Sequence, residues 1–79
     1  MFFKRIRELR EDSDLKQKQL ADALNMKQRA YSYYENGGRT IPPEVLSKLA
    51  DFHYTSVDYL MGRTDTRKPY PKAGENDTK

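Results

Sequence analysis

The fold is decided by residues 17–36, which read QKQLADALNMKQRAYSYYEN. The apolar residues of this stretch recur at the spacing of two amphipathic helices, and we expect them to point inward: Leu20, Leu24, Met26, Tyr31 and Tyr34. Between the two runs stands Asn25, one of the few residues other than glycine that tolerate the positive φ of a tight turn. Ala21 is small enough to lie where two helices cross at a steep angle. The stretch therefore predicts two short helices joined by a tight turn.

The flanking sequence predicts three more helices and no strand. Phe2, Ile6 and Leu9 recur at i, i+4 and i+7, which indicates a first amphipathic helix. The third helix should end at Asn36-Gly37, because glycine readily takes the left-handed conformation that closes a helix. A fourth helix should start at Pro42-Pro43 and bury one face, made up of Val45, Leu46, Leu49, Ala50 and His53. A very short fifth helix would be capped by Ser56 and end at Gly62, so the fold class is all-α with five helices.

Composition changes after Gly62. Residues 63–79 contain two prolines, many charges and a single large apolar side chain, that of Tyr70. Such a segment can bury little apolar surface. We therefore expect one compact domain over residues 1–62 and a flexible polar tail over residues 63–79.

The positive charge is concentrated in one part of the chain. The net charge is +3, and residues 16–39 carry five basic side chains against Asp22 and Glu35. An anionic partner approaching this part of the surface would be attracted. A solvated basic surface without a partner explains the same charge, so composition alone does not decide between them.

The order and spacing of several short motifs resemble those of the lambda-repressor-like, or Xre-type, helix-turn-helix family of bacterial and phage regulators. The resemblance covers roughly residues 3–62. The motifs are Arg5-Ile-Arg-Glu-Leu-Arg10, Gln17-x-x-Leu20-Ala21, Tyr34-Glu35-x-Gly37, Leu49-Ala50 and Ser56-Val-Asp-Tyr-Leu-Met-Gly62. The resemblance implies a sequence-specific regulator of transcription, a repressor, with double-stranded DNA as its partner. It also implies a homodimer on a palindromic operator. Whether the dimer forms only on DNA is left open.

In such a domain the third helix, about Gln28 to Asn36, enters the major groove. Four outward, hydrogen-bonding side chains are then the candidates for reading bases: Gln28, Arg29, Ser32 and Tyr33. For Tyr33, a role in covering the neighbouring helix is the alternative. The resemblance assigns Gln28 to a base and Gln17, at the start of the second helix, to a phosphate.

Phosphate contacts are expected from residues around both helix starts and from the loop after the third helix: Lys16, Gln17, Lys27, Asn36, Arg39 and Thr40. Lys16 and Lys27 depart from the family, which prefers Ser or Thr there. Lysine cannot cap a helix N-terminus and is unfavourable beside the positive end of its dipole. That cost is easier to understand if both lysines face phosphates.

Other residues are expected to be structural. The family pattern implies that Arg10 and Glu35 pair and tie the first helix to the third. Tyr31 stands at an inward position usually held by Ile or Val, so its hydroxyl must find a partner or reach solvent. His53 is expected to pack between helices. Tyr59, Leu60 and Met61, on the short fifth helix, are the candidates for a dimer contact.

Catalysis, metal binding and membrane insertion find no support in the sequence. The chain has one histidine, no cysteine and no glycine-rich phosphate loop, so we expect no catalytic residue, metal or other cofactor, and no small-molecule ligand. The absence of an apolar membrane span or signal peptide favours a cytoplasmic protein. The rival interpretation is an antitoxin-like or adaptor module that keeps the fold and acts through another protein.

Overall fold

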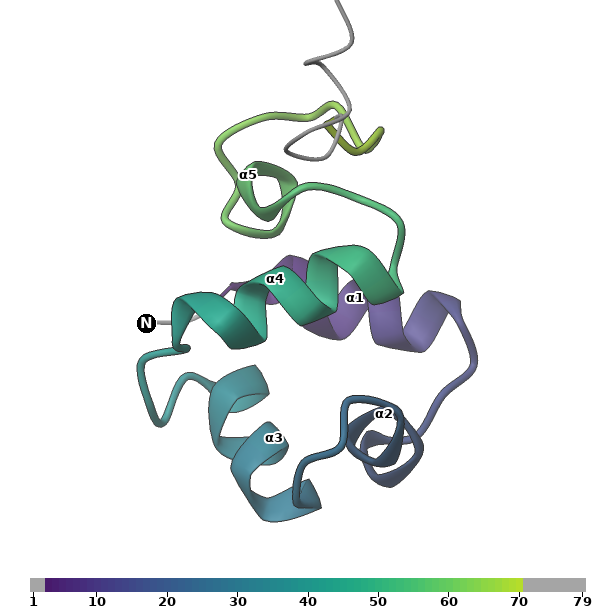
Figure 1. Ribbon diagram of the computed structural model, residues 1–79, viewed down its shortest axis with the longest axis vertical. Helices are drawn as coiled ribbons and strands as arrows, with labels where there is room; N and C mark the ends of the chain where they lie inside the picture. The colour runs from purple at the N-terminus through teal and green to yellow at the C-terminus, as the bar shows by residue number, and fades with distance from the viewer. Residues whose placement is uncertain (1–2, 71–79) are drawn as a thin grey trace, which may run out of the picture.

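The computed structural model describes residues 3–70, which form five helices and no strand. The helices are α1 (Lys4–Asp12), α2 (Gln17–Ala23), α3 (Gln28–Asn36), α4 (Pro43–Phe52) and α5 (Val57–Leu60). Figure 1 shows α2 and α3 together at one end of the molecule and α5 at the other, with α1 and α4 between them. The predicted all-α, five-helix fold is confirmed, although Phe2 lies outside the described residues.

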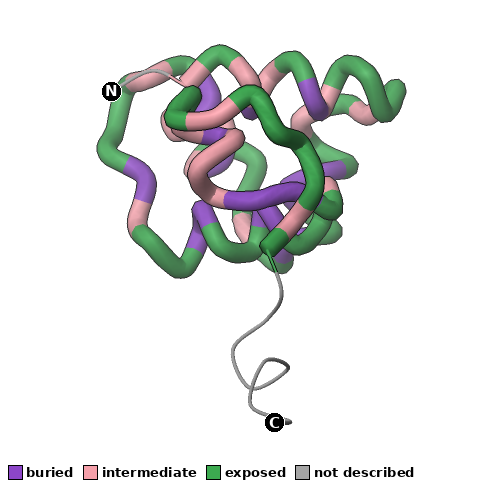
Figure 2. The backbone as a smooth tube through the Cα atoms, turned by 90° about the horizontal axis from the view of Figure 1, so that it is seen from above, coloured by how far each residue is buried: buried purple, intermediate pink, exposed green. Residues whose placement is uncertain are grey.

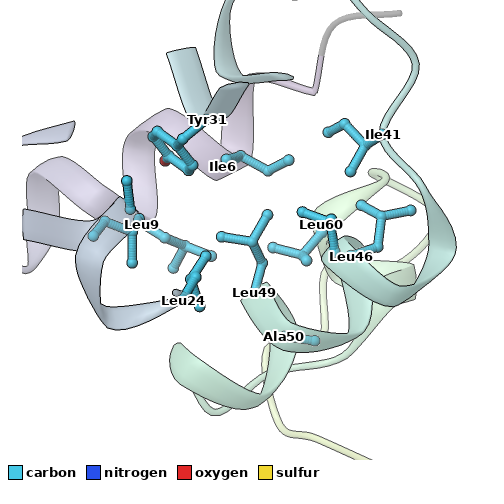
Figure 3. Packing of buried hydrophobic residues seen from close by; sticks show 12 residues of the cluster. Ile6, Leu9, Leu24, Tyr31, Ile41, Leu46, Leu49, Ala50 and Leu60 are labelled. Atoms are coloured by element: carbon cyan, nitrogen blue, oxygen red, sulfur yellow. The ribbon is translucent and has the colours of Figure 1, made fainter. Parts of the chain in front are cut away.

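The core lies where the five helices meet (Figure 3). Each helix contributes the apolar face that its sequence spacing predicts, and the side chains with 2% or less of their surface exposed include Ile6, Leu9, Leu20, Tyr31, Leu49 and Leu60. Ala21 has no exposed surface, as expected of a small residue where α2 crosses α3. Buried and exposed residues alternate along the helices, as Figure 2 shows, because each helix has one face on the core and one in solvent.

Two turns fix the direction of α3. Asn25 has φ 58° between α2 and α3, and the backbone N–H of Met26 donates to the carbonyl of Ala21 at 2.9 Å. At the other end Gly37 has φ 82°, and the N–H of Gly38 donates to the carbonyl of Tyr33 at 2.8 Å. Both left-handed positions are those predicted from the sequence. They set where α3 begins and ends.

The cap of α5 is also as predicted. The Ser56 hydroxyl accepts from the N–H of Tyr59 at 3.0 Å. Leu60, however, is only 1% exposed, so the expectation that it contributes to a dimer surface is wrong. Its side chain faces the core, since α5 is too short to present two apolar faces. Tyr59 and Met61 are half-buried.

Residues 63–70 are the first part of the expected flexible tail, and they contact the helices. They run back along α5 without forming a helix (Figure 1). Arg5 donates to the carbonyls of Tyr59 and Thr64 and pairs with Asp65 at 2.7 Å, and the Thr55 hydroxyl donates to the carbonyl of Arg67 at 2.6 Å. These polar contacts hold the segment in place, because its sequence has little apolar surface to bury. The remainder of the expected tail, residues 71–79, lies outside the described residues.

Candidate nucleic-acid interface

The outward face of α3 is where the predicted base-reading residues lie. Gln28 and Arg29 are exposed on its first turn, and Ser32 and Tyr33 are half-buried one turn later. The inward face of the same helix carries Tyr31, which has no exposed surface. The helix is therefore split between a side fixed in the core and a side of hydrogen-bonding groups. Such a face suits the edges of bases in a major groove.

Tyr33 contacts two arginines of this surface. The Nε of Arg29 donates to the Tyr33 hydroxyl at 3.3 Å. The guanidinium of Arg39 lies over the Tyr33 ring, 4.7 Å from its centroid. Sequence reasoning treated these residues separately and placed Arg39 among the phosphate contacts. The i, i+4 spacing of Arg29 and Tyr33 could have indicated the first contact.

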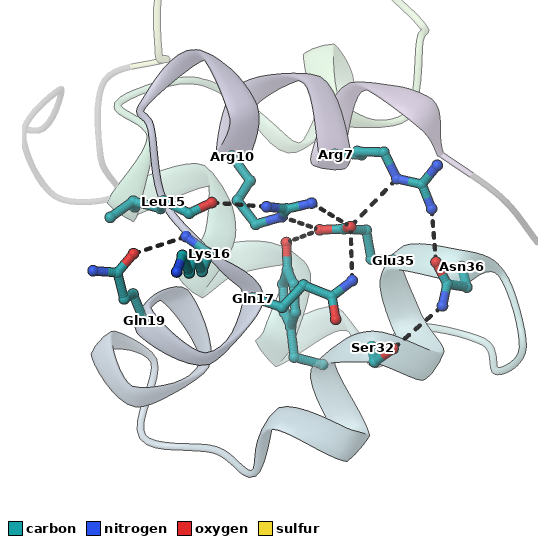
Figure 4. Close-up of polar contacts among 10 residues, drawn as sticks. Arg7, Arg10, Leu15, Lys16, Gln17, Gln19, Ser32, Glu35 and Asn36 are labelled. Carbon is teal, nitrogen blue, oxygen red and sulfur yellow. Dashed lines mark hydrogen bonds and ion pairs between the residues drawn. The ribbon is translucent and has the colours of Figure 1, made fainter.

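Ser32 and Asn36 are hydrogen-bonded to each other, and Asn36 is also hydrogen-bonded to α1 (Figure 4). The Asn36 amide donates to the Ser32 hydroxyl at 3.2 Å, and its carbonyl oxygen accepts from Arg7 at 2.7 Å. Arg7 was not singled out by sequence reasoning. Its place on α1 gave no signal, because its partners Glu35 and Asn36 are 28 and 29 positions away in the chain. The contact fixes how Asn36 is presented at the end of α3.

Glu35 is the centre of the polar network beneath α3. Its carboxylate has no exposed surface and accepts from Arg10 at 2.7 and 3.0 Å, from the Tyr31 hydroxyl at 2.6 Å and from the Gln17 amide at 3.0 Å (Figure 4). Arg7 adds a longer contact of 3.3 Å. Arg10 also donates to the carbonyl of Leu15. The network joins α1, α2 and α3, and it supplies the partner that the buried Tyr31 hydroxyl needs.

The donors around Glu35 keep it ionised. Burial by itself raises the pKa of this carboxyl, but hydrogen bonds from Arg10, Tyr31 and Gln17 outweigh that effect and lower the pKa to about 2. Burial and the same carboxylate raise the pKa of Tyr31 well above its usual range. Glu35 is thus a charged, fully paired group at neutral pH, not an acid or base available for chemistry.

Gln17 occupies the first position of α2 but points partly toward Glu35. One N–H of its amide is used there, which leaves its second N–H and the backbone N–H groups of the first turn of α2 for an anion. The structure thus gives Gln17 a structural contact that sequence reasoning did not foresee. Its phosphate contact stays a prediction.

The helix starts at Lys16 and Lys27 have no side-chain cap, as their chemistry requires. At Lys16 the Gln19 side chain compensates, since its Oε1 accepts from the Lys16 backbone N–H at 2.8 Å. Both lysines are exposed, as are Arg39 and Thr40. Exposed cations at two uncapped helix starts form a surface suited to anions.

His53 packs against Phe52, with the ring centroids 5.1 Å apart in an edge-to-face arrangement. Its Nε2 is buried and has no hydrogen-bond partner among the described residues. Burial, and to a lesser extent the charge of Arg67, lower the pKa of His53. The histidine follows the last residue of α4, at the opposite end of that helix from the turn that leads out of α3.

Within residues 3–70, no group of three or more His, Asp or Glu side chains is placed to hold a metal ion. None of the helices in this range is long and apolar enough to span a bilayer.

Comparison with known proteins gives a consistent result. Residues 6–60 match the helix-turn-helix family. The chain is 35% identical over 69 residues to the HTH-type transcriptional regulator YobD of Bacillus subtilis, a match that covers 87% of this chain and 62% of YobD. It is 35% identical over 71 residues to the HTH-type transcriptional regulator AnsR of the same bacterium, covering 90% of this chain and 61% of AnsR.

A phage protein is similar as well. The cryptic phage CTXphi transcriptional repressor RstR of Vibrio cholerae is 32% identical over 66 residues, which are 84% of this chain and 60% of RstR. In each comparison the match spans about three fifths of the relative's length. What is shared is therefore the helix-turn-helix region.

Proposed function

This chain belongs to the lambda-repressor-like, Xre-type helix-turn-helix family, and we propose that it represses transcription by binding a specific DNA sequence through α3. The relatives named as transcriptional regulators support regulation, and the phage relative named as a repressor supports repression. Their bacterial and phage origin favours action on DNA inside a bacterial cell. A DNA-binding role accounts for the surface without any catalytic step.

The observation that carries the proposal is the division of α3 into two faces. Tyr31 and Glu35 anchor the inward face without any exposed surface, while Gln28 and Arg29 are exposed at the start of the helix. A helix held this firmly can present side chains in a fixed register to a groove. Gln28 has the amide that pairs with N6 and N7 of adenine, so we assign it to a base.

Backbone phosphates would be contacted from either side of α3. Lys16 and Lys27, at the uncapped starts of α2 and α3, bring charge and backbone N–H groups to one strand. Asn36 and Thr40, at and after the end of α3, would reach the other. Gln17 would add its remaining amide N–H to the contacts at the start of α2. These contacts set the register of the helix and carry no sequence information.

We further propose that two copies bind a palindromic operator. One recognition helix reads too few base pairs to define an operator, and two copies on successive major grooves would lie about 34–36 Å apart. Tyr59 and Met61 remain the candidates for contact between copies, since both are half-buried on the monomer.

The test is selection of bound sequences from random duplex DNA, followed by footprinting of the selected site. We expect a short motif that occurs twice in inverted orientation, with its two centres about one helical turn apart. Recovery of no motif would contradict sequence-specific binding and would favour the antitoxin-like or adaptor role. A single, unrepeated half-site at saturating protein would contradict the dimer alone.

A further inference from the structure

We propose that Tyr33 is a positioning residue that holds Arg29 and Arg39 for reading guanines, so that each half-site carries guanines beside the start of α3. The inference rests on the proposed function, since it requires α3 to lie in a groove. It assigns Arg39 to a base, whereas the sequence placed it on a phosphate. It also gives Tyr33 a task other than direct contact with DNA.

The first step is that Tyr33 contacts both arginines at once. Arg29 lies one turn before it on α3 and donates to its hydroxyl through Nε. Arg39 comes from the loop after α3, and its guanidinium carbon lies over the ring, 4.7 Å from the centroid. The loop itself is tied to the same residue, because the N–H of Gly38 donates to the Tyr33 carbonyl at 2.8 Å. One side chain therefore orders two cations that are ten positions apart.

The second step concerns which N–H groups of the two arginines remain available for another partner. A guanidinium bonded through Nε keeps both Nη groups at its far edge for another partner. A guanidinium that lies over an aromatic ring is held there by a cation–π contact, which uses none of its N–H donors. Hydrogen bonds to a base edge require the guanidinium to lie near the plane of the base, so fixing that plane in advance lowers the entropy cost of reading.

The third step is the character of the hollow that these residues enclose. It has a volume of about 290 Å³ and is lined by Lys27, Arg29, Ala30, Tyr33 and Arg39. No carboxylate lines it, and three of the five lining side chains are cations that repel one another when the hollow holds only water. A ligand whose edge carries hydrogen-bond acceptors and no donor relieves the repulsion between the three cations.

Among the base pairs, this selects guanine. In the major groove guanine presents two acceptors, O6 and N7. Adenine places a donor beside its N7, cytosine offers a donor, and thymine offers one acceptor beside a methyl group. Arginine donates to O6 and N7 of guanine through two hydrogen bonds, and its planar fork holds the two donors in a fixed geometry.

The experiment uses the full chain and the duplex recovered by selection. Each guanine of the half-site is replaced in turn by an analogue with C–H in place of N7, which removes one acceptor and keeps base pairing. We expect two positions at which the analogue weakens binding by about three- to tenfold, roughly one lost bond of a bidentate pair. The same change elsewhere in the half-site should have little effect.

Variants then assign each position. Arg39→Ala and Arg29→Ala each remove one guanidinium, so each should abolish the analogue effect at one position and leave the other. Tyr33→Phe removes the hydroxyl and should reduce the effect only at the position that depends on Arg29. Tyr33→Leu removes the ring as well and should reduce both. Tyr54→Phe is the control, since Tyr54 is 77% exposed and lies after α4. Thermal melting of each variant verifies that it is folded.

Three results would overturn the inference: a selected half-site without guanine at two such positions, indifference of the native protein to the analogue, or retention of both effects in Tyr33→Leu. With specific binding still present, the first two results show that the arginines do not read guanines, and the third shows that Tyr33 does not position them. All three leave the proposed function standing. Failure to select any sequence would instead reject the proposed function.

Discussion

At the scale of single residues, Glu35 contributes most to holding the site together. A buried carboxylate is strongly unfavourable unless hydrogen bonds replace its lost water. Here two arginines, a tyrosine and a glutamine donate to it, and they come from all three helices around the turn. The ion pairs of Glu35 therefore add little net stability, yet the carboxylate fixes the orientation of α3 relative to α1 and α2.

Removing one partner should be costly. We expect Arg10→Ala to lower the free energy of unfolding by about 3–5 kcal/mol, because it leaves the charge of Glu35 buried and under-paired. Glu35→Ala should lower it by a similar amount. Denaturant unfolding of both single variants and of the double variant measures this. Simple addition of the two effects in the double variant would show that the pair does not act as a unit.

A surface pair provides the matched control. Lys18 and Asp22 lie 3.3 Å apart on α2, with 71% and 65% of their side chains exposed. Lys18→Ala should change the free energy of unfolding by less than about 1 kcal/mol. Neither Arg10→Ala nor the control should alter which DNA sequence is preferred, provided that binding is measured where the variants are folded.

Stability should fall in acid through Glu35. The pKa of this carboxyl is about 2 in the folded chain and near its ordinary 4.5 in the unfolded chain. The stabilisation from this difference is present in full above pH 4.5 and is lost as the pH falls from there toward 2, because the unfolded state takes up the proton first. Thermal melting against pH should show this loss, and Glu35→Gln should show a smaller one over the same range. Equal slopes for both proteins would contradict the assignment.

At the scale of elements, the turn between α2 and α3 is set by one residue. Asn25 has φ 58°, which costs a residue with a Cβ about 1–2 kcal/mol but is tolerated by asparagine and unstrained in glycine. Asn25→Ala should therefore lower the stability by about 1 kcal/mol, while Asn25→Gly should leave it within about 0.5 kcal/mol of the native value. Denaturant unfolding compares the two, and equal losses would mean that φ is not the determinant.

The helices and turns could be predicted because their signals are local. Apolar spacing, the prolines at the start of α4, Ser56 before α5 and Gly37 after α3 each act within a few residues. The contacts of Arg7 with Asn36 and of Arg5 with residues 64 and 65 could not be predicted. They join positions far apart in the chain through flexible side chains, and only the packed fold brings them together.

The same distinction applies to the site. Gln28 and Arg29 were predicted to point outward, and they do, because helical periodicity fixes the direction of a side chain. The contact of Gln17 with Glu35, and that of Arg39 with Tyr33, depend on rotamers and on the path of a loop. Helical periodicity predicts neither contact, so both had to be seen in the structure.

At the scale of the whole molecule, the exposed part of the α2–α3 region carries an excess of positive charge. Glu35 is buried and pairs with Arg7 and Arg10 of α1, and Asp22 and Lys18 offset each other, which leaves Lys16, Lys27, Arg29 and Arg39. We expect log K for DNA to fall linearly with log salt, with a slope of roughly −0.9 for each phosphate neutralised. Lys27→Ala should make the slope shallower by about one unit if that lysine holds a phosphate. Fluorescence titration over a range of salt concentrations measures both, and an affinity that does not change with salt would contradict the electrostatic account.

The central claim is that α3 reads bases, and Gln28→Ala tests it most directly. The measurement is the affinity of this variant for the selected operator and for every single-base change in it, beside the native protein and the control Tyr54→Phe, a change at a side chain that is 77% exposed and lies after α4. The account predicts a loss of about 1–3 kcal/mol on the preferred operator and relaxed choice at one or two positions for Gln28→Ala alone. An unchanged ranking of the operator panel in Gln28→Ala would contradict it.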